Sequence, residues 1–135
     1  MAGSRADGRS AGPGSPVSSI ASARVALVDP AATLHEVATK LSAVEVGALV
    51  VSTTVAMVGI ISERDLIVAL RDKRDLETAT AGDVASTDVI WCEPTATVGD
   101  ARALMIEHHV RHLVVGDGST PSAILSARDV LAALG

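Results

Sequence analysis

Short apolar runs alternate with longer segments of helical spacing along most of the chain. The first part begins with an apolar run at 25–28, and a helix is then predicted by apolar residues that recur every three or four positions, namely Leu34, Val37, Ala38, Leu41 and Val44. Two β-branched runs follow at 48–51 and 55–61, separated by a polar turn. A last apolar set predicts a second helix, and it consists of Leu66, Ile67, Ala69 and Leu70. The expected order is β-α-β-β-α.

Four of the expected helix starts carry a capping-box signature, in which Ser or Thr is followed three residues later by an acidic residue. The pairs are Thr33 with Glu36, Ser62 with Asp65, Thr97 with Asp100 and Ser126 with Asp129. Each hydroxyl can accept a backbone N–H of the first turn, and each carboxylate can reach back to the capping residue. The pairs therefore set the expected starts of four helices.

The pattern occurs twice without a gap. Ser62-Glu-Arg-Asp65 and Ser126-Ala-Arg-Asp129 lie 64 positions apart, and 46–51 pairs with 110–115 at the same offset. One copy of about 55 residues would be only marginally stable alone, so we expect the two to pack together. The predicted organisation is a flexible tail at 1–16, repeat 1 at 17–72, a linker at 73–80 and repeat 2 at 81–135.

Composition narrows the possible functions. The 135 residues are 48% hydrophobic, but Trp91 is the only aromatic residue, so the core must be built from aliphatic side chains. A net charge of -5 without a basic stripe argues against nucleic-acid binding. No apolar run is long enough for a membrane span, and the first residues lack a signal-peptide apolar region. With Cys92 as the single cysteine, a cytoplasmic location is expected.

Each of the two predicted hairpins ends in a motif that resembles a motif of the CBS domain family. They are Gly59-Ile-Ile-Ser-Glu-Arg-Asp65 and Ala123-Ile-Leu-Ser-Ala-Arg-Asp129. The resemblance covers roughly residues 17 to 135 and implies a mixed α/β (α+β) fold, with two β-α-β-β-α repeats packed as a pseudo-twofold pair. It also implies clefts between the repeats that bind an adenosine-containing ligand such as AMP, ADP, ATP or S-adenosylmethionine, with the motif aspartate on the ribose hydroxyls.

Elementary chemistry supports the same use of Ser62 and Asp65. A helix N-terminus attracts anions, and a carboxylate on its first turn can accept hydrogen bonds from two vicinal hydroxyls, which ribose provides. The alternative is that Ser-x-x-Asp only caps the helix, because Thr33 with Glu36 has the same spacing outside the motif.

The resemblance assigns the candidate ligand residues to two clefts, each joining one motif to the start of strands in the other repeat. The first cleft is expected to contain Ser62, Arg64, Asp65, Thr87, Val89, Arg111 and His112. The second is expected to contain Ser126, Arg128, Asp129, Ser22, Val25 and Gly47. Because Arg111 has Gly47 as its counterpart in the other copy, the first cleft is expected to favour phosphates, unless Arg111 is simply a solvated surface residue.

No catalytic, metal or required cofactor site is expected. His108, His109 and His112 are close in sequence, but a helix should end before the strand at His112, which breaks a metal-binding geometry. Cys92 and Trp91 are interpreted as packing residues of an apolar strand. The resemblance to the CBS domain family implies a stand-alone regulatory module without enzyme activity, which forms a homodimer and acts on an unidentified protein. The alternative is a ligand-free structural or interaction module.

Overall fold

Two three-stranded sheets form the framework of the computed structural model, which describes residues 12–21, 25–44 and 46–134. The sheets have the strand orders β1-β2-β3 and β4-β5-β6. In each sheet the first strand is parallel to the second, and the second and third form an antiparallel hairpin. The strands are β1 (Leu27–Val28), β2 (Ala48–Ser52), β3 (Met57–Ser62), β4 (Trp91–Cys92), β5 (His112–Gly116) and β6 (Pro121–Ser126).

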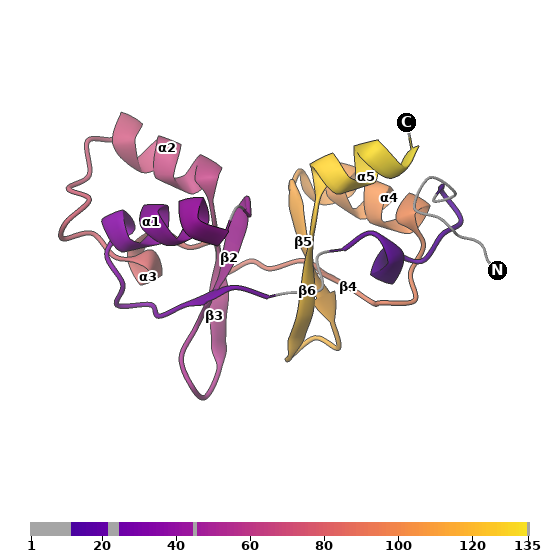
Figure 1. Cartoon of the computed structure of the whole chain (residues 1–135), viewed down its shortest axis with the longest axis horizontal. Helices are drawn as coiled ribbons and strands as arrows, with labels where there is room; N and C mark the ends of the chain where they lie inside the picture. Colours follow the sequence, from indigo (N-terminus) through magenta and orange to yellow (C-terminus); the bar gives the residue numbers. More distant parts are fainter. Residues whose placement is uncertain (1–11, 22–24, 45, 135) are drawn as a thin grey trace. The chain divides into compact units, whose positions relative to one another are not determined.

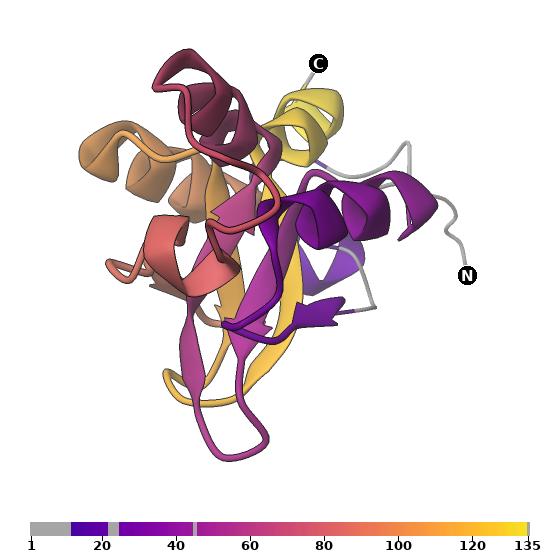
Figure 2. The same cartoon turned by 90° about the vertical axis from the view of Figure 1, so that its left-hand side faces the viewer.

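Helices cover one face of each sheet, as Figure 1 and Figure 2 show for α1 and α2. The helices are α1 (Leu34–Val44), α2 (Glu63–Arg71), α3 (Ala81–Val84), α4 (Val98–His108) and α5 (Ala127–Leu134). The order β-α-β-β-α therefore occurs twice, as the sequence predicted. Within the described ranges, no helix is both long and apolar enough to cross a membrane.

Strand alternation places the same three positions of each repeat in its core. Leu49, Val51 and Ile61 are fully buried against the helices of the first sheet. Their counterparts 64 positions later are equally buried in the second core, namely Leu113, Val115 and Leu125. Because successive side chains of a strand point to opposite faces, this alternate set faces the helices. Both cores are aliphatic, as the composition required.

The second strand of the first hairpin begins two residues later than the sequence predicted. The run at 55–61 was expected to be a strand, but β3 begins at Met57 and Val55 is 92% exposed in the turn. The Thr53 hydroxyl accepts the backbone N–H of Val55 at 3.2 Å and that of Ala56 at 3.0 Å. This side-chain-stabilised turn overrides the β propensity of Val55.

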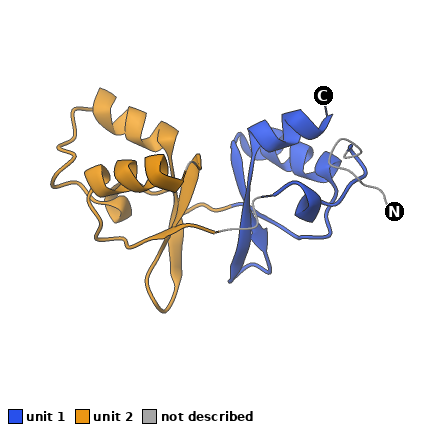
Figure 3. Ribbon diagram, viewed as in Figure 1, with its two compact units in different colours: residues 1–24, 90–135 blue, residues 25–89 orange. Residues whose placement is uncertain are grey.

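The chain divides into two compact units whose boundaries differ from those of the sequence repeats (Figure 3). One unit combines residues 1–24 with 90–135, and the other consists of residues 25–89. We refer to them as unit 1 and unit 2, respectively. Each unit thus contains the body of one repeat together with the segment that leads into the other repeat.

In unit 2, the segment that leads into the second repeat closes the start of α1. The backbone N–H groups of Leu34 and His35 donate to the carbonyls of Ala79 and Leu76, both at 3.0 Å. The first turn of a helix has N–H groups without a helical partner, and these carbonyls satisfy two of them. The expected linker therefore has a structural role in the first repeat.

In unit 1, residues near the N-terminus do the same for α4. The N–H of Val98 donates to the Ser15 carbonyl at 2.8 Å, and the N–H of Gly99 donates to the Pro13 carbonyl at 2.9 Å. The buried side chain of Val17 joins the same core, from a 3-10 helix at Val17–Ser19. Residues 12–16, which the sequence analysis placed in the tail, therefore contact the second repeat.

Candidate functional site

Among the described residues, helices α1 to α5 all begin with the same kind of capping box. The four expected pairs are all formed, and a fifth closes α3, where Thr80 and Asp83 bond reciprocally at 3.0 and 3.3 Å. The backbone N–H of Thr80 lowers the pKa of Asp83, and the Thr80 hydroxyl adds to this effect. Residues 73–80 were expected to form a linker, and this pair was not predicted although Thr80-Ala-Gly-Asp83 carries the same signature.

The box at the start of α2 contains the first motif aspartate. Asp65 Oδ2 accepts the backbone N–H of Ser62 at 2.8 Å and the Ser62 hydroxyl at 3.0 Å. In return, the N–H of Asp65 donates to Ser62 Oγ at 3.3 Å. Within the described part of the chain, Oδ1 of Asp65 has no hydrogen-bond donor. One carboxylate oxygen therefore caps the helix, and the other is available to a ligand.

The second motif has the same arrangement at the start of α5. Asp129 Oδ2 accepts the N–H of Ser126 at 3.2 Å, and the N–H of Asp129 donates to Ser126 Oγ at 3.0 Å. Asp65 and Asp129 are both half-buried, whereas the capping carboxylates outside the motifs are exposed, namely Glu36, Asp83 and Asp100. The two motif aspartates thus differ from ordinary caps in their burial.

Each unit also brings other predicted residues to its own helix start. In unit 2, the N–H of Glu63 donates to the Gly47 carbonyl at 3.0 Å, so Gly47 lies beside the first turn of α2. In unit 1, the N–H of Ala127 donates to the Arg111 carbonyl at 2.7 Å. His112 pairs with Ser126 across β5 and β6. Arg111 and His112 therefore lie next to the second motif.

Thr87 lies beside β3, in a segment that also packs in unit 2. Ile60 and Ser86 exchange two backbone hydrogen bonds of 3.0 and 2.9 Å, which adds residues 85–87 to the free edge of β3. A Cβ on Gly59 would lie 3.4 Å from the Cα of Thr87. Glycine at position 59 therefore allows the backbone of this segment to approach the strand.

The remaining predicted residues have simpler surroundings. Arg64 and Arg128 are exposed, each on the first turn of its helix. Val25 and Val89 are half-buried and each precedes the first strand of a repeat. Ser22 lies outside the described residues. The candidate ligand residues were predicted to form two clefts. Each predicted cleft contains residues of both units, and this grouping stays a prediction.

The chemistry available at the two helix starts is hydrogen-bond acceptance next to a partial positive charge. The free Oδ1 of each aspartate can accept a hydroxyl, and the helix N-terminus attracts an anionic group. No group of three or more potential metal ligands occurs in the described ranges. Burial raises the pKa of the Cys92 thiol, which disfavours the reactive thiolate. The arrangement is suited to binding a polar molecule with hydroxyl groups.

The model of the CBS domain family matches the chain twice, at residues 17–72 and 81–135. The chain belongs to the CBS-domain family. The two matched CBS repeats coincide with the two copies found by internal comparison of the sequence, so the resemblance based on the hairpin motifs is confirmed.

Relatives of known sequence or structure agree with this assignment. The CBS domain-containing protein YhcV of Bacillus subtilis is 31% identical over 110 residues, which are 79% of this chain and 76% of that protein. A CBS-domain containing protein of Agrobacterium tumefaciens is 25% identical with a TM-score of 0.81, over 90% of this chain and 95% of that chain. A CBS domain protein of Pyrobaculum aerophilum, solved in complex with AMP, is 30% identical with a TM-score of 0.75, over 84% and 88% of the two chains.

Proposed function

We propose that this CBS pair is a regulatory module that binds an adenosine-containing nucleotide between its repeats and transmits binding through its association with itself or with another protein. The half-buried motif aspartates carry the proposal, because each has one carboxylate oxygen without a hydrogen-bond donor in the described chain. Vicinal ribose hydroxyls are suitable donors for such an oxygen. The AMP complex of the relative from Pyrobaculum aerophilum supports the choice of ligand class.

The phosphate of such a nucleotide would need a cation. Arg111 is the cation that the second repeat has and the first lacks, since Gly47 occupies the equivalent position. A guanidinium can bind a phosphate through two parallel hydrogen bonds. We therefore expect the cleft that contains Arg111 to bind phosphorylated ligands more tightly than the other cleft does.

The capping boxes favour a second candidate, a ligand-free interaction module. Three boxes outside the motifs, each with Thr and an acidic residue, close a helix through the same reciprocal hydrogen bonds. Under this alternative, the serines and aspartates of the two motifs have only that role. The two candidates make opposite predictions about nucleotides.

Thermal unfolding with AMP, ADP, ATP and S-adenosylmethionine separates the two candidates. A ligand that binds only the folded protein stabilises it by about 2.7 kcal/mol at a hundred times its dissociation constant. We expect at least one of these nucleotides to raise the melting temperature in a saturable manner. If none has an effect at millimolar concentration, the ligand-free module is the correct description.

Self-association is the expected means of signalling, and both repeats present apolar residues for it. Ile67 on α2 is 65% exposed, and Leu131, which occupies the equivalent position on α5, is 68% exposed. A symmetric dimer interface is built from self-complementary patches, and apolar surface on both repeats can contribute to one.

A reducing, cytoplasmic setting is expected from the single buried Cys92.

Replacing both apolar residues with charged ones should therefore give a monomer. In the variant Ile67→Glu with Leu131→Glu, a homodimer interface through α2 and α5 would have to bury unpaired carboxylates, which is strongly unfavourable. Sedimentation velocity of the wild-type and variant proteins measures the change. The control is Val55→Glu, at a 92% exposed turn position outside both helices. A wild-type monomer, or an unchanged dimer in the double variant, would contradict the proposed interface.

A further inference from the structure

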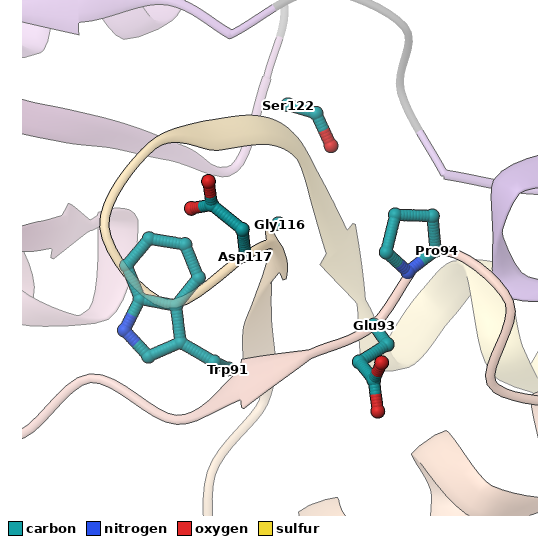
Figure 4. A pocket seen from close by; sticks show the side chains of 6 residues that line it. All are labelled: Trp91, Glu93, Pro94, Gly116, Asp117 and Ser122. Carbon is teal, nitrogen blue, oxygen red and sulfur yellow. The ribbon is translucent and has the colours of Figure 1, made fainter.

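A hollow of about 580 Å³ lies in unit 1, at the end of the sheet away from the second motif. It is lined by Trp91, Glu93, Pro94, Gly116, Asp117 and Ser122 (Figure 4). The pairing of Gly116 with Pro121 marks this end of the β5–β6 hairpin, whereas His112 pairs with Ser126 at the other end. The hollow is therefore separate from the helix start that carries Asp129. Its volume is within the range of small-molecule sites.

The ionisable residues that line the hollow are both acidic. Asp117 Oδ1 accepts the backbone N–H of Thr120 at 2.7 Å and that of Ser119 at 2.9 Å. These hydrogen bonds, with that of Thr120 the stronger influence, lower the pKa of Asp117 and keep it ionised. Within the described chain, neither Asp117 nor Glu93 forms an ion pair with a Lys, Arg or His. The hollow thus holds two carboxylates without an internal counter-ion.

Glycine at position 116 makes room for the indole of Trp91. A Cβ on Gly116 would lie 2.8 Å from Cζ3 of Trp91 and would also meet the carbonyl of Thr120. Figure 4 shows Trp91, Gly116 and Asp117 on one side of the hollow, with Glu93 and Pro94 opposite. The half-buried indole is therefore part of the wall of the hollow rather than of the aliphatic core. Trp91 was interpreted as a packing residue, and its indole lies directly beside Gly116.

The first repeat shows that the fold does not require these residues. At the equivalent positions, Leu27 replaces Trp91, Ser52 replaces Gly116 and Thr53 replaces Asp117. The strand pairing is the same in both repeats, because Leu27 is opposite Val50 as Trp91 is opposite Val114. The second repeat thus carries an aromatic ring, a glycine and an additional carboxylate that the fold of a repeat does not require.

We propose that this hollow binds a small organic cation with a guanidinium or alkylammonium group. An indole face attracts such cations, most strongly when part of the water is displaced. Ionised carboxylates add charge-assisted hydrogen bonds to the N–H donors of the same group. The indole of Trp91 and the carboxylates of Asp117 and Glu93, which have no cationic partner among the described residues, together match the flat or compact cation of a small ligand.

Intrinsic fluorescence tests the proposal directly, because Trp91 is the only tryptophan and the chain has no tyrosine. The full chain is titrated with N-butylguanidine, and its neutral counterpart N-butylurea serves as the ligand control. We expect a saturable change in Trp91 emission with N-butylguanidine and none with N-butylurea. The absence of a saturable change up to millimolar concentration, or an equal response to both compounds, would overturn the proposal.

Two variants locate the cation. Asp117→Asn retains a side-chain oxygen that can accept the N–H groups of Ser119 and Thr120, so the turn is kept while the charge is lost. It should bind N-butylguanidine at least about threefold more weakly, the upper part of the range for an exposed charge pair. Trp91→Leu introduces the residue of the first repeat, and calorimetry should show a loss of similar size or larger. The control is Asp88→Asn, at an exposed acidic residue outside the hollow. Unchanged affinity in both Asp117→Asn and Trp91→Leu would contradict the assignment.

Discussion

Replacing Gly59 with alanine should destabilise the protein by about 1–3 kcal/mol, the usual cost of inserting an atom into a well-packed site. The added Cβ would meet the carbonyl oxygen of Ser86, which belongs to the backbone and cannot move alone. That carbonyl also accepts the N–H of Ile60 at 3.0 Å, and the N–H of Ser86 donates back to Ile60 at 2.9 Å. Relief of the clash would therefore weaken both hydrogen bonds at the edge of β3.

Equilibrium unfolding in urea measures this effect through the midpoint of the transition. Gly14→Ala is the matched control, since a Cβ at that position would have no atom within 4 Å. The control should unfold at the wild-type urea concentration or slightly above it, because alanine restricts the unfolded chain more than glycine does. An equal midpoint for Gly59→Ala and wild type would mean that residues 85–87 do not pack against β3 in solution.

Replacing Asp65 with asparagine should weaken nucleotide binding by about tenfold to a hundredfold, which corresponds to the loss of a hydrogen bond to a charged group. The asparagine side-chain oxygen can still accept the N–H of Ser62, so the start of α2 keeps its cap. What disappears is the negative charge that the ribose hydroxyls would contact. Calorimetric titration with the nucleotide that gives the largest thermal shift measures the change.

Asp100 provides the matched control for this variant. It closes α4 with Thr97 through bonds of 3.1 and 3.0 Å, in the same box geometry, but it is exposed and lies outside the family motif. Asp100→Asn should therefore keep its helix cap and have the nucleotide affinity of the wild type. If Asp65→Asn and Asp100→Asn bind the nucleotide with equal affinity, Asp65 only caps helix α2.

Local patterns accounted for most of what the sequence predicted correctly. The apolar run that predicted β2, and the capping box of Ser62 with Asp65, each depend on neighbours a few residues away. The four-residue helix α3 was missed because it is too short to show helical periodicity, although Thr80 and Asp83 carried its capping signature. Val55 was misassigned because its β propensity gave no indication of the turn around it.

Contacts between distant segments could not be predicted in this way. The carbonyls of Pro13 and Ser15 close the start of α4 more than eighty residues later in the chain, and nothing in their residue types specifies that partner. The hollow beside Trp91 depends on three strands, and Gly116 gave no signal by itself because glycine also occurs in ordinary turns. The candidate ligand residues were identified through a motif, whereas their grouping into clefts requires both units.

We propose above that the two motif aspartates bind a nucleotide in addition to capping their helices. Calorimetric titration of the most stabilising nucleotide into the wild type and into the double variant Asp65→Asn with Asp129→Asn tests it most directly. We expect saturable binding to the wild type and an affinity at least about tenfold lower in the folded double variant. Equal affinity in the two proteins, or a wild type that binds none of the four nucleotides, would contradict it.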